Sequence, residues 1–235
     1  FDAIKFDFMQ KSEEGEDEGI LHRFSSFLKK SIFYAYSLTK VSFISEVTFR
    51  NAVAYLIDDI DIQDTEIPFA ATAVDLRKGE KYILKQGSLR KAVSASSSLP
   101  GVMPPVEIDG TFLVDGGWVE AIPAQTAYEL GADFVIGVDI SPNIEDESEF
   151  SNVLNIIFRA DRIARYTLAK KSAEQADFSL EPEVGDIDWK DFSNPQDKIE
   201  KGRAFAKDSF EDVKKALQEK SKPSMFKRIK NIFSR

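Results

Sequence analysis

A short apolar segment that ends in a carboxylate and two glycines is the clearest candidate for chemistry in this sequence of 235 residues. It reads TFLVDGG from Thr111 to Gly117, and its first four residues favour a β-strand. Gly116 and Gly117 permit a sharp turn and the close approach of another group. Asp115 would then stand at the carboxyl end of a strand, where α/β proteins often build active sites. The segment alone leaves two interpretations open: an active-site carboxylate, or an aspartate that merely caps a turn.

Composition excludes several other kinds of chemistry. The chain has no cysteine, which rules out disulfides, zinc–thiolate sites and thiol nucleophiles. Its formal charge of -9 argues against general nucleic-acid binding. His22 is the single histidine, so a Ser-His-Asp triad would depend on it, and its charged surroundings favour a solvated side chain instead. No acidic segment has the ligand spacing of a calcium loop, and we expect neither a metal nor a cofactor.

The sequence begins at Phe1, without an initiator methionine or a signal-peptide pattern. We therefore expect a piece of a longer, cytoplasmic protein. No apolar run approaches the roughly 20 residues that would cross a bilayer.

The first third of the chain predicts helices followed by strands. Alternating residues from Ala3 to Phe8 predict a short strand, and spacings of three and four predict helices from Ile20 and over Phe43–Ile57. The many aromatic residues of this region form core stripes or the wall of a lipid site, and both interpretations stay open. Phe69–Val74 is typical of a strand covered on both faces in a parallel sheet, and Lys81–Lys85 should pair back as a hairpin.

The middle of the chain predicts the elements around the aspartate. A helix of small residues runs from Leu89 to about Ser98 with Ser88 as its N-cap, and Val106–Val114 reads as a hairpin with its turn at Gly110. A helix between Pro123 and Gly131 leads to a buried strand, Phe134–Val138. Strand, helix and strand in this order predict a right-handed βαβ unit and a parallel or mixed sheet.

The last third predicts two long helices and a basic tail. Apolar residues mark one helix from Val153 to Thr167 and another from Ile199 to Leu217, with an irregular segment, Asp177–Pro195, between them. From Lys220 to Arg235 there is no acidic residue, and basic and apolar residues alternate at helical spacing. This tail is either an amphipathic helix that binds an anionic membrane surface or a frayed terminus that keeps the protein in solution.

Four segments in this order resemble the patatin-like phospholipases, in particular the bacterial branch related to neuropathy target esterase. They are PFAATAVDLRKGEKYILKQG (Pro68–Gly87), LRKAVSASSSLPGVMPPVEIDG (Leu89–Gly110), TFLVDGGWVEAIPAQTAYELGADFVIGVDIS (Thr111–Ser141), and ADFSLEPEV with IEKGRAF further on. The resemblance extends roughly from Pro68 to Leu217. It implies a three-layer α/β/α fold with a mostly parallel sheet and helices on both faces, incomplete in this chain. Residues 1–219 would be the C-terminal part of the domain and residues 220–235 the tail.

The resemblance also implies a reaction. In this family a serine of a Gly-x-Ser-x-Gly segment attacks an ester carbonyl, and the aspartate of an Asp-Gly-Gly segment accepts its proton. By this resemblance Asp115 is the base, Gly116 and Gly117 clear space around it, and the substrate is a lipid or another ester. No histidine is needed.

One departure from the family pattern is that the sequence contains neither Gly-x-Ser-x-Gly nor a glycine-rich oxyanion loop. We expect the nucleophile on a preceding segment or a separate chain, so the parent protein would be a serine hydrolase and these 235 residues alone would be inactive. The alternative is a catalytically incapable patatin-like module that binds a membrane or a protein partner.

Overall fold

The computed structural model describes residues 41–147, 150, 152–183 and 195–221. The chain divides into two compact units, Phe1–Phe43 and Ile44–Arg235, and every described helix and strand belongs to the second. The strand expected at Ala3–Phe8, the helix expected from Ile20 up to residue 40, and the tail beyond Ser221 lie outside the described residues.

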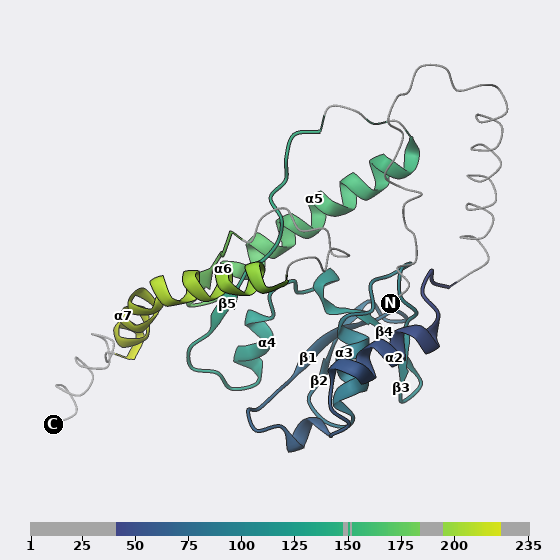
Figure 1. Ribbon diagram of the computed structural model, residues 1–235, viewed down its shortest axis with the longest axis horizontal. Coiled ribbons are helices and arrows are strands. Elements are labelled where there is room, and N and C mark those ends of the chain that lie inside the picture. Colours follow the sequence, from purple (N-terminus) through teal and green to yellow (C-terminus); the bar gives the residue numbers. More distant parts are fainter. Residues whose placement is uncertain (1–40, 148–149, 151, 184–194, 222–235) are drawn as a thin grey trace, which may run out of the picture. The chain divides into compact units, whose positions relative to one another are not determined.

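A four-stranded antiparallel sheet carries the aspartate (Figure 1). Its strands are β1 (Ala71–Asp75), β2 (Glu80–Leu84), β3 (Val106–Ile108) and β4 (Thr111–Asp115), in the order β2-β1-β4-β3. Antiparallel pairing corrects the parallel pairing expected for β1. The reason is the length of the connection: only residues 76–79 join β1 to β2, and so short a link can join only antiparallel strands. In the same way, only Asp109 and Gly110, both with positive φ, join β3 to β4.

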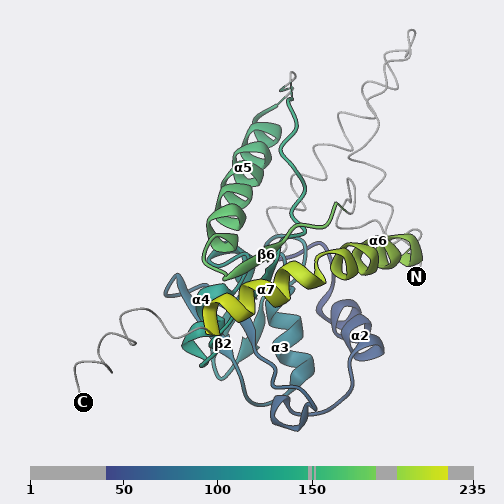
Figure 2. The same ribbon diagram turned by 90° about the vertical axis from the view of Figure 1, so that its left-hand side faces the viewer.

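The strand β1 is buried along its whole length, as expected. The helix α3 (Leu89–Ser96) contacts β1, β3 and β4, and the helix α2 (Glu46–Leu56) lies beside α3 (Figures 1 and 2). Ser45 and Ser88 cap these helices, so the helices expected at Phe43–Ile57 and from Leu89 are confirmed. The small side chains of α3 let it lie close to the sheet, in a core formed by Ile62, Ala71, Ala73, Leu84, Ala92, Ala95 and Leu113.

A separate two-stranded parallel sheet follows. It pairs β5 (Ile136–Val138) with β6 (Phe178–Leu180), and the long helix α5 (Val153–Ala173) connects them. The βαβ unit expected from β4 through the helix α4 (Ala124–Glu129) to β5 is wrong, because β4 and β5 lie in different sheets. The strand β6 falls in a segment expected to be irregular.

The strand β5 differs from the sequence expectation, whereas the helix α4 agrees with it. Ile136 and Val138 are about half exposed, so β5 is not the buried strand expected at Phe134–Val138. The helix α4 does begin after Pro123, and Gly131 follows its end with φ of 101°. Helices and strands together confirm the α/β class, with parallel pairing confined, in the described residues, to β5 and β6.

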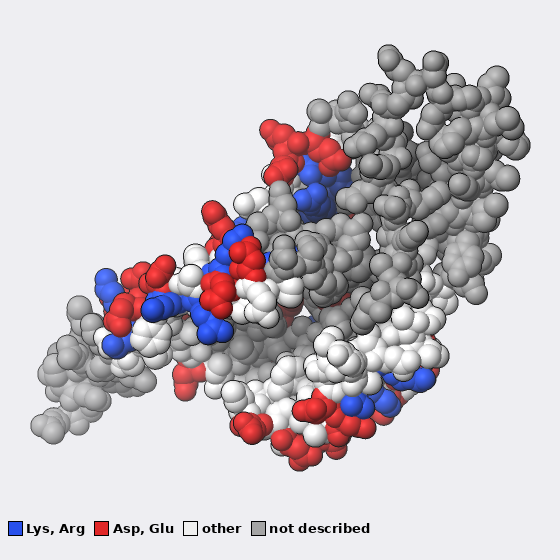
Figure 3. All heavy atoms as spheres, in the orientation of Figure 1, with Lys and Arg blue, Asp and Glu red and all other residues white. Residues whose placement is uncertain are grey.

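The C-terminal part contains two helices where one was expected, α6 (Pro195–Asp208) and α7 (Phe210–Ser221), with the break at Ser209. Basic and acidic side chains intermingle over these helices on the face shown in Figure 3. Lys220, the first residue of the expected tail, still belongs to α7. Its ammonium pairs with Asp177 and lies over the ring of Tyr128, so this residue is already held by the fold. Every described helix is too short or too polar to span a bilayer.

Candidate active site

Asp115 is the last residue of β4 and caps the 3₁₀ turn η3 (Gly116–Trp118). Its Oδ1 accepts a hydrogen bond of 2.8 Å from the backbone N–H of Gly117, and its own N–H donates to the carbonyl of Ser98 at 3.0 Å. Among the described residues no donor reaches Oδ2. The turn-capping interpretation is therefore correct for one oxygen, while the other keeps its lone pairs available.

The surroundings of Asp115 favour proton acceptance. The side chain is half-buried, and this burial raises the pKa of the carboxyl above its ordinary value. The hydrogen bond from Gly117 and the positive charge of Arg165 act in the opposite direction without cancelling the effect. A carboxylate with a raised pKa is a stronger base than an exposed one, and such shifts gather at functional sites.

The two positions after Asp115 are occupied by glycine for different structural reasons. A Cβ on Gly116 would collide with the backbone carbonyl and the hydroxyl of Thr72 on β1, so the turn can pack onto the sheet only without a side chain. A Cβ on Gly117 would stand 3.3 Å from Asp115 Oδ1, a close contact that a small shift of the carboxylate could relieve. Gly116 therefore permits the tight turn at Asp115–Trp118, which we call the corner, and Gly117 leaves room for the carboxylate of Asp115.

No hydroxyl in the described residues is hydrogen-bonded to Asp115. Ser98 comes near it through its backbone, but its side chain is fully buried and donates to the carbonyl of Pro104 at 2.7 Å. His22 lies outside the described residues. Within those residues no group of three or more acidic or histidine side chains could hold a metal ion. The described part of the chain therefore brings together the base expected from the sequence and its glycines, and no nucleophile among its own residues.

A buried carboxylate that sequence reasoning missed lies just beyond the corner. Glu120 accepts hydrogen bonds from the backbone N–H and the hydroxyl of Thr126, in the first turn of α4, and from the ammonium of Lys81 on β2 at 3.0 Å. Burial alone would raise the pKa of Glu120, but these hydrogen bonds outweigh it and lower the pKa. Glu120 thus ties α4 to the sheet. The signal was a lone charge within the apolar sequence WVEAIP.

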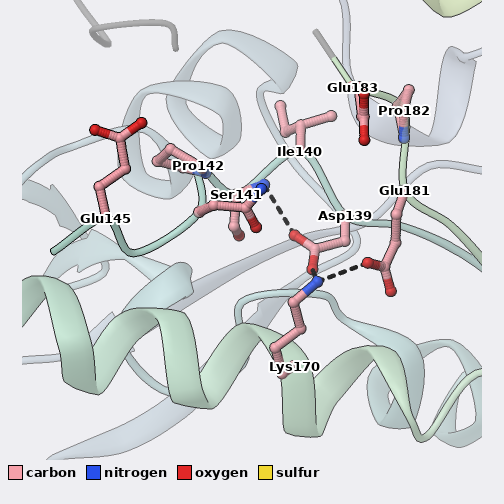
Figure 4. A pocket seen from close by; sticks show the side chains of 10 residues that line it. Asp139, Ile140, Ser141, Pro142, Glu145, Lys170, Glu181, Pro182 and Glu183 are labelled. Atoms are coloured by element: carbon pink, nitrogen blue, oxygen red, sulfur yellow. Dashed lines mark hydrogen bonds and ion pairs between the residues drawn. The ribbon is translucent and has the colours of Figure 1, made fainter. Parts of the chain in front are cut away.

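A pocket of about 390 Å³ lies elsewhere, at the carboxyl ends of β5 and β6. Figure 4 shows the Lys170 ammonium of α5 between two carboxylates, 3.2 Å from Asp139 Oδ2 and 2.6 Å from Glu181 Oε2. Asp139 is buried, which by itself would raise its pKa, but the hydrogen bonds from Ser141 and the charge of Lys170 lower it. Asp115 does not line this pocket, where one ammonium stands between two carboxylates.

Comparison with known proteins finds similarity to one family. The family model described as patatin-like phospholipase matches residues 13–128. The mouse patatin-like phospholipase domain-containing protein 7 is 32% identical over 130 residues, which are 54% of this chain and 9% of that protein. The human patatin-like phospholipase domain-containing protein 6 is 30% identical over 129 residues, 54% of this chain and 9% of its own length. An NTE family protein of Mycobacterium tuberculosis is 30% identical over 105 residues, 45% of this chain and 29% of that protein.

The chain is thus similar to the patatin-like phospholipases over residues 13–128, a range that includes the Asp-Gly-Gly turn. The resemblance seen in the sequence is thereby confirmed, although its extent differs. The family model begins before Pro68, at residue 13, and ends at residue 128, so residues 129–217 lie outside it. The chain spans less than a third of the length of each of these relatives.

Proposed function

We propose that this chain supplies the general base, Asp115, of a serine lipid acyl hydrolase. The observation that carries the proposal is the state of the Asp115 carboxylate: half-buried, raised in pKa, anchored through Oδ1 and open at Oδ2. A group that is fixed by one oxygen and free at the other can accept a proton without losing its position.

The reaction would proceed in two stages. Oδ2 accepts the proton of a serine hydroxyl as the serine oxygen bonds to the ester carbonyl carbon, and the proton then passes to the departing alcohol as the ester C–O bond breaks. Water, deprotonated by the same carboxylate, releases the acid and restores the serine. The hydroxyl must come within about 3 Å of Oδ2 for either transfer.

The nucleophile and the oxyanion donors would come from polypeptide outside these 235 residues. In support, the sequence has no Gly-x-Ser-x-Gly and no glycine-rich loop, and no described hydroxyl pairs with Asp115. The chain alone should therefore not hydrolyse esters.

The substrate class follows from the relatives, whose names describe patatin-like phospholipase domains. We propose a lipid ester, presented at a membrane surface with help from the basic residues of the tail, Lys222, Lys227, Arg228, Lys230 and Arg235. Removal of residues 222–235 should weaken binding to anionic vesicles measured by co-sedimentation. Equal binding with and without these residues would contradict a membrane role for the tail.

The test of the base uses the complete protein that contains this chain. A fluorophosphonate probe should label its serine, and Asp115→Asn should lower ester turnover by about 10³-fold or more, because the proton would have no acceptor. Asp139→Asn is the matched control, since it neutralises another aspartate that follows a strand, and assays below its melting temperature should show turnover near that of the wild type.

Two results would overturn the proposal. Turnover that survives Asp115→Asn would remove Asp115 from the mechanism. Failure of the folded protein to react with the probe would favour the alternative, a catalytically inactive module that binds a membrane or a partner.

A further inference from the structure

The strand β5 exposes a row of apolar side chains along one face. Ile136 and Val138 are 46% and 51% exposed, and Ile140, two residues past the strand, is 66% exposed. Buried and exposed residues alternate from 135 to 140, so these three side chains share one face. The opposite face is filled, because a Cβ on Gly137 would come 3.2 Å from Cγ2 of Ile122.

A parallel sheet that is covered on one face only is an exception. The strands β5 and β6 pair in parallel, and parallel sheets occur almost only where other elements cover both of their faces. A single exposed apolar side chain is ordinary, but a row along one strand marks a surface that another element covers.

The same strand also has a free edge. In a parallel pair, the backbone groups of successive residues point to opposite sides of the strand. The carbonyl of Val135 and the N–H of Asp139 both bond to β6. The N–H and C=O groups of Ile136 and Val138, which alternate with these, therefore point to the other side. Among the described residues no strand pairs with β5 on that side.

The two edges of the four-stranded sheet differ from this one, because they carry charged side chains. The edge strand β2 contains Glu80 and Lys81, and the edge strand β3 contains Glu107. Charges on an edge strand hinder pairing with a further strand, and natural proteins use them to that end. The strand β5 reads Ile-Gly-Val and carries no charge, so its edge is open to pairing.

A parallel neighbour of β5 would come from a distant part of the sequence. Parallel strands are joined by crossovers of about a dozen residues or more, usually through a helix that covers one face of the sheet. Such a strand and its crossover helix would meet both needs of β5, a partner for the edge and a cover for the apolar face. The relatives are more than three times as long as this chain, which leaves ample polypeptide to supply both.

We propose that β5 is the docking strand for the polypeptide that carries the nucleophile: an apolar strand of that polypeptide pairs in parallel with the free edge, and its crossover helix covers Ile136, Val138 and Ile140. The strand β5 then becomes an inner strand of a larger parallel sheet. The identity of the docked polypeptide rests on the proposed function, whereas the docking of a strand at β5 does not.

The first test places a photo-reactive benzoylphenylalanine at Val138 in the complete protein. Because this side chain lies on the proposed surface, irradiation should link it to a segment outside these 235 residues, which mass spectrometry of the digested product identifies. Leu76, in the turn after β1, is the matched control, since it is 52% exposed and lies away from β5 in the sequence and in the sheets. The same replacement at Leu76 should give no link to that segment.

The second test is hydrogen exchange, which needs no substitution. In the complete protein the amides of Ile136 and Val138 should exchange about 100-fold more slowly than unpaired amides, because each would donate to the docked strand. The amide of Gly137, which faces β6, is the internal reference for a paired position.

The outcomes separate this inference from the proposed function. A link from position 138 to a second copy of the protein, or to residues 1–43 of this chain, assigns the surface to another occupant and overturns the proposal. Loss of either expected signal, the link or the slow exchange, overturns it as well. Both signals in a folded protein that does not hydrolyse esters support the docking and overturn the proposed function instead.

Discussion

Two aspartates stand where a strand ends, and their surroundings differ in the feature that decides their use. Asp115 follows β4 with one oxygen hydrogen-bonded and the other open, and its pKa is raised. Asp139 follows β5 with one oxygen bonded to the N–H of Ser141 and the other beside Lys170, and its pKa is lowered. A carboxylate whose charge is matched by a partner holds structure together, whereas one kept partly desolvated with a free lone pair can accept a proton.

The largest expected effect on stability is the loss of the turn that holds Asp115 in place. Gly116→Ala places a methyl group against the backbone of Thr72, which cannot rotate away, and should lower the free energy of unfolding by about 3 kcal/mol or more. Gly117→Ala meets only the Asp115 carboxylate and should lower it by about 1 kcal/mol. Urea unfolding of both variants measures the difference. Equal losses would mean that the contact with Thr72 does not set the requirement for glycine.

The next largest effect is that replacing the two aspartates by asparagine should change the free energy of unfolding in opposite directions. Asp139→Asn removes the charge that pairs with Lys170 and should lower the free energy of unfolding by about 1–3 kcal/mol. Asp115→Asn keeps the cap on Gly117 and removes a desolvated charge, so it should raise that free energy by about 0.5–1 kcal/mol. Thermal unfolding of the two variants checks both signs. A clear loss of stability in Asp115→Asn would identify Asp115 as a structural residue.

The local parts of this comparison can be predicted from the sequence, because turns and caps depend on adjacent residues. The turn at Gly110, the cap Ser88 and the Asp-Gly-Gly turn all follow from residue type and spacing of a few positions. The resemblance to a family then implied for Asp115 the role of a base, which the segment alone left open.

The distant parts could not be predicted, because they depend on which elements meet in space. Nothing near β4 indicates that it pairs with β1 rather than with β5. Lys170 reaches Asp139 and Glu181 only because α5 crosses back between two parallel strands, and Lys81 meets Glu120 across 39 positions of sequence.

The smallest effect is a difference in pH dependence. The folded-state pKa of Asp139 lies below its ordinary value of 3.8, so its stabilising contribution is present above pH 3.8 and is lost as the pH falls through the folded value. Asp115 has the opposite sign: its raised pKa means that the folded state gains stability as the pH falls from neutrality towards 3.8.

Urea unfolding between pH 3 and pH 8 should therefore show a shallower acid loss in Asp139→Asn than in the wild type. In Asp115→Asn the gain over the wild type should be largest near neutrality and disappear below about pH 3.8. The pKa of Glu120 is also lowered, so both variants should still lose some stability at acidic pH. Parallel curves for the wild type and Asp115→Asn would show that the Asp115 carboxyl titrates alike in the folded and unfolded chain, and the contrast between the two aspartates would then be one of geometry alone.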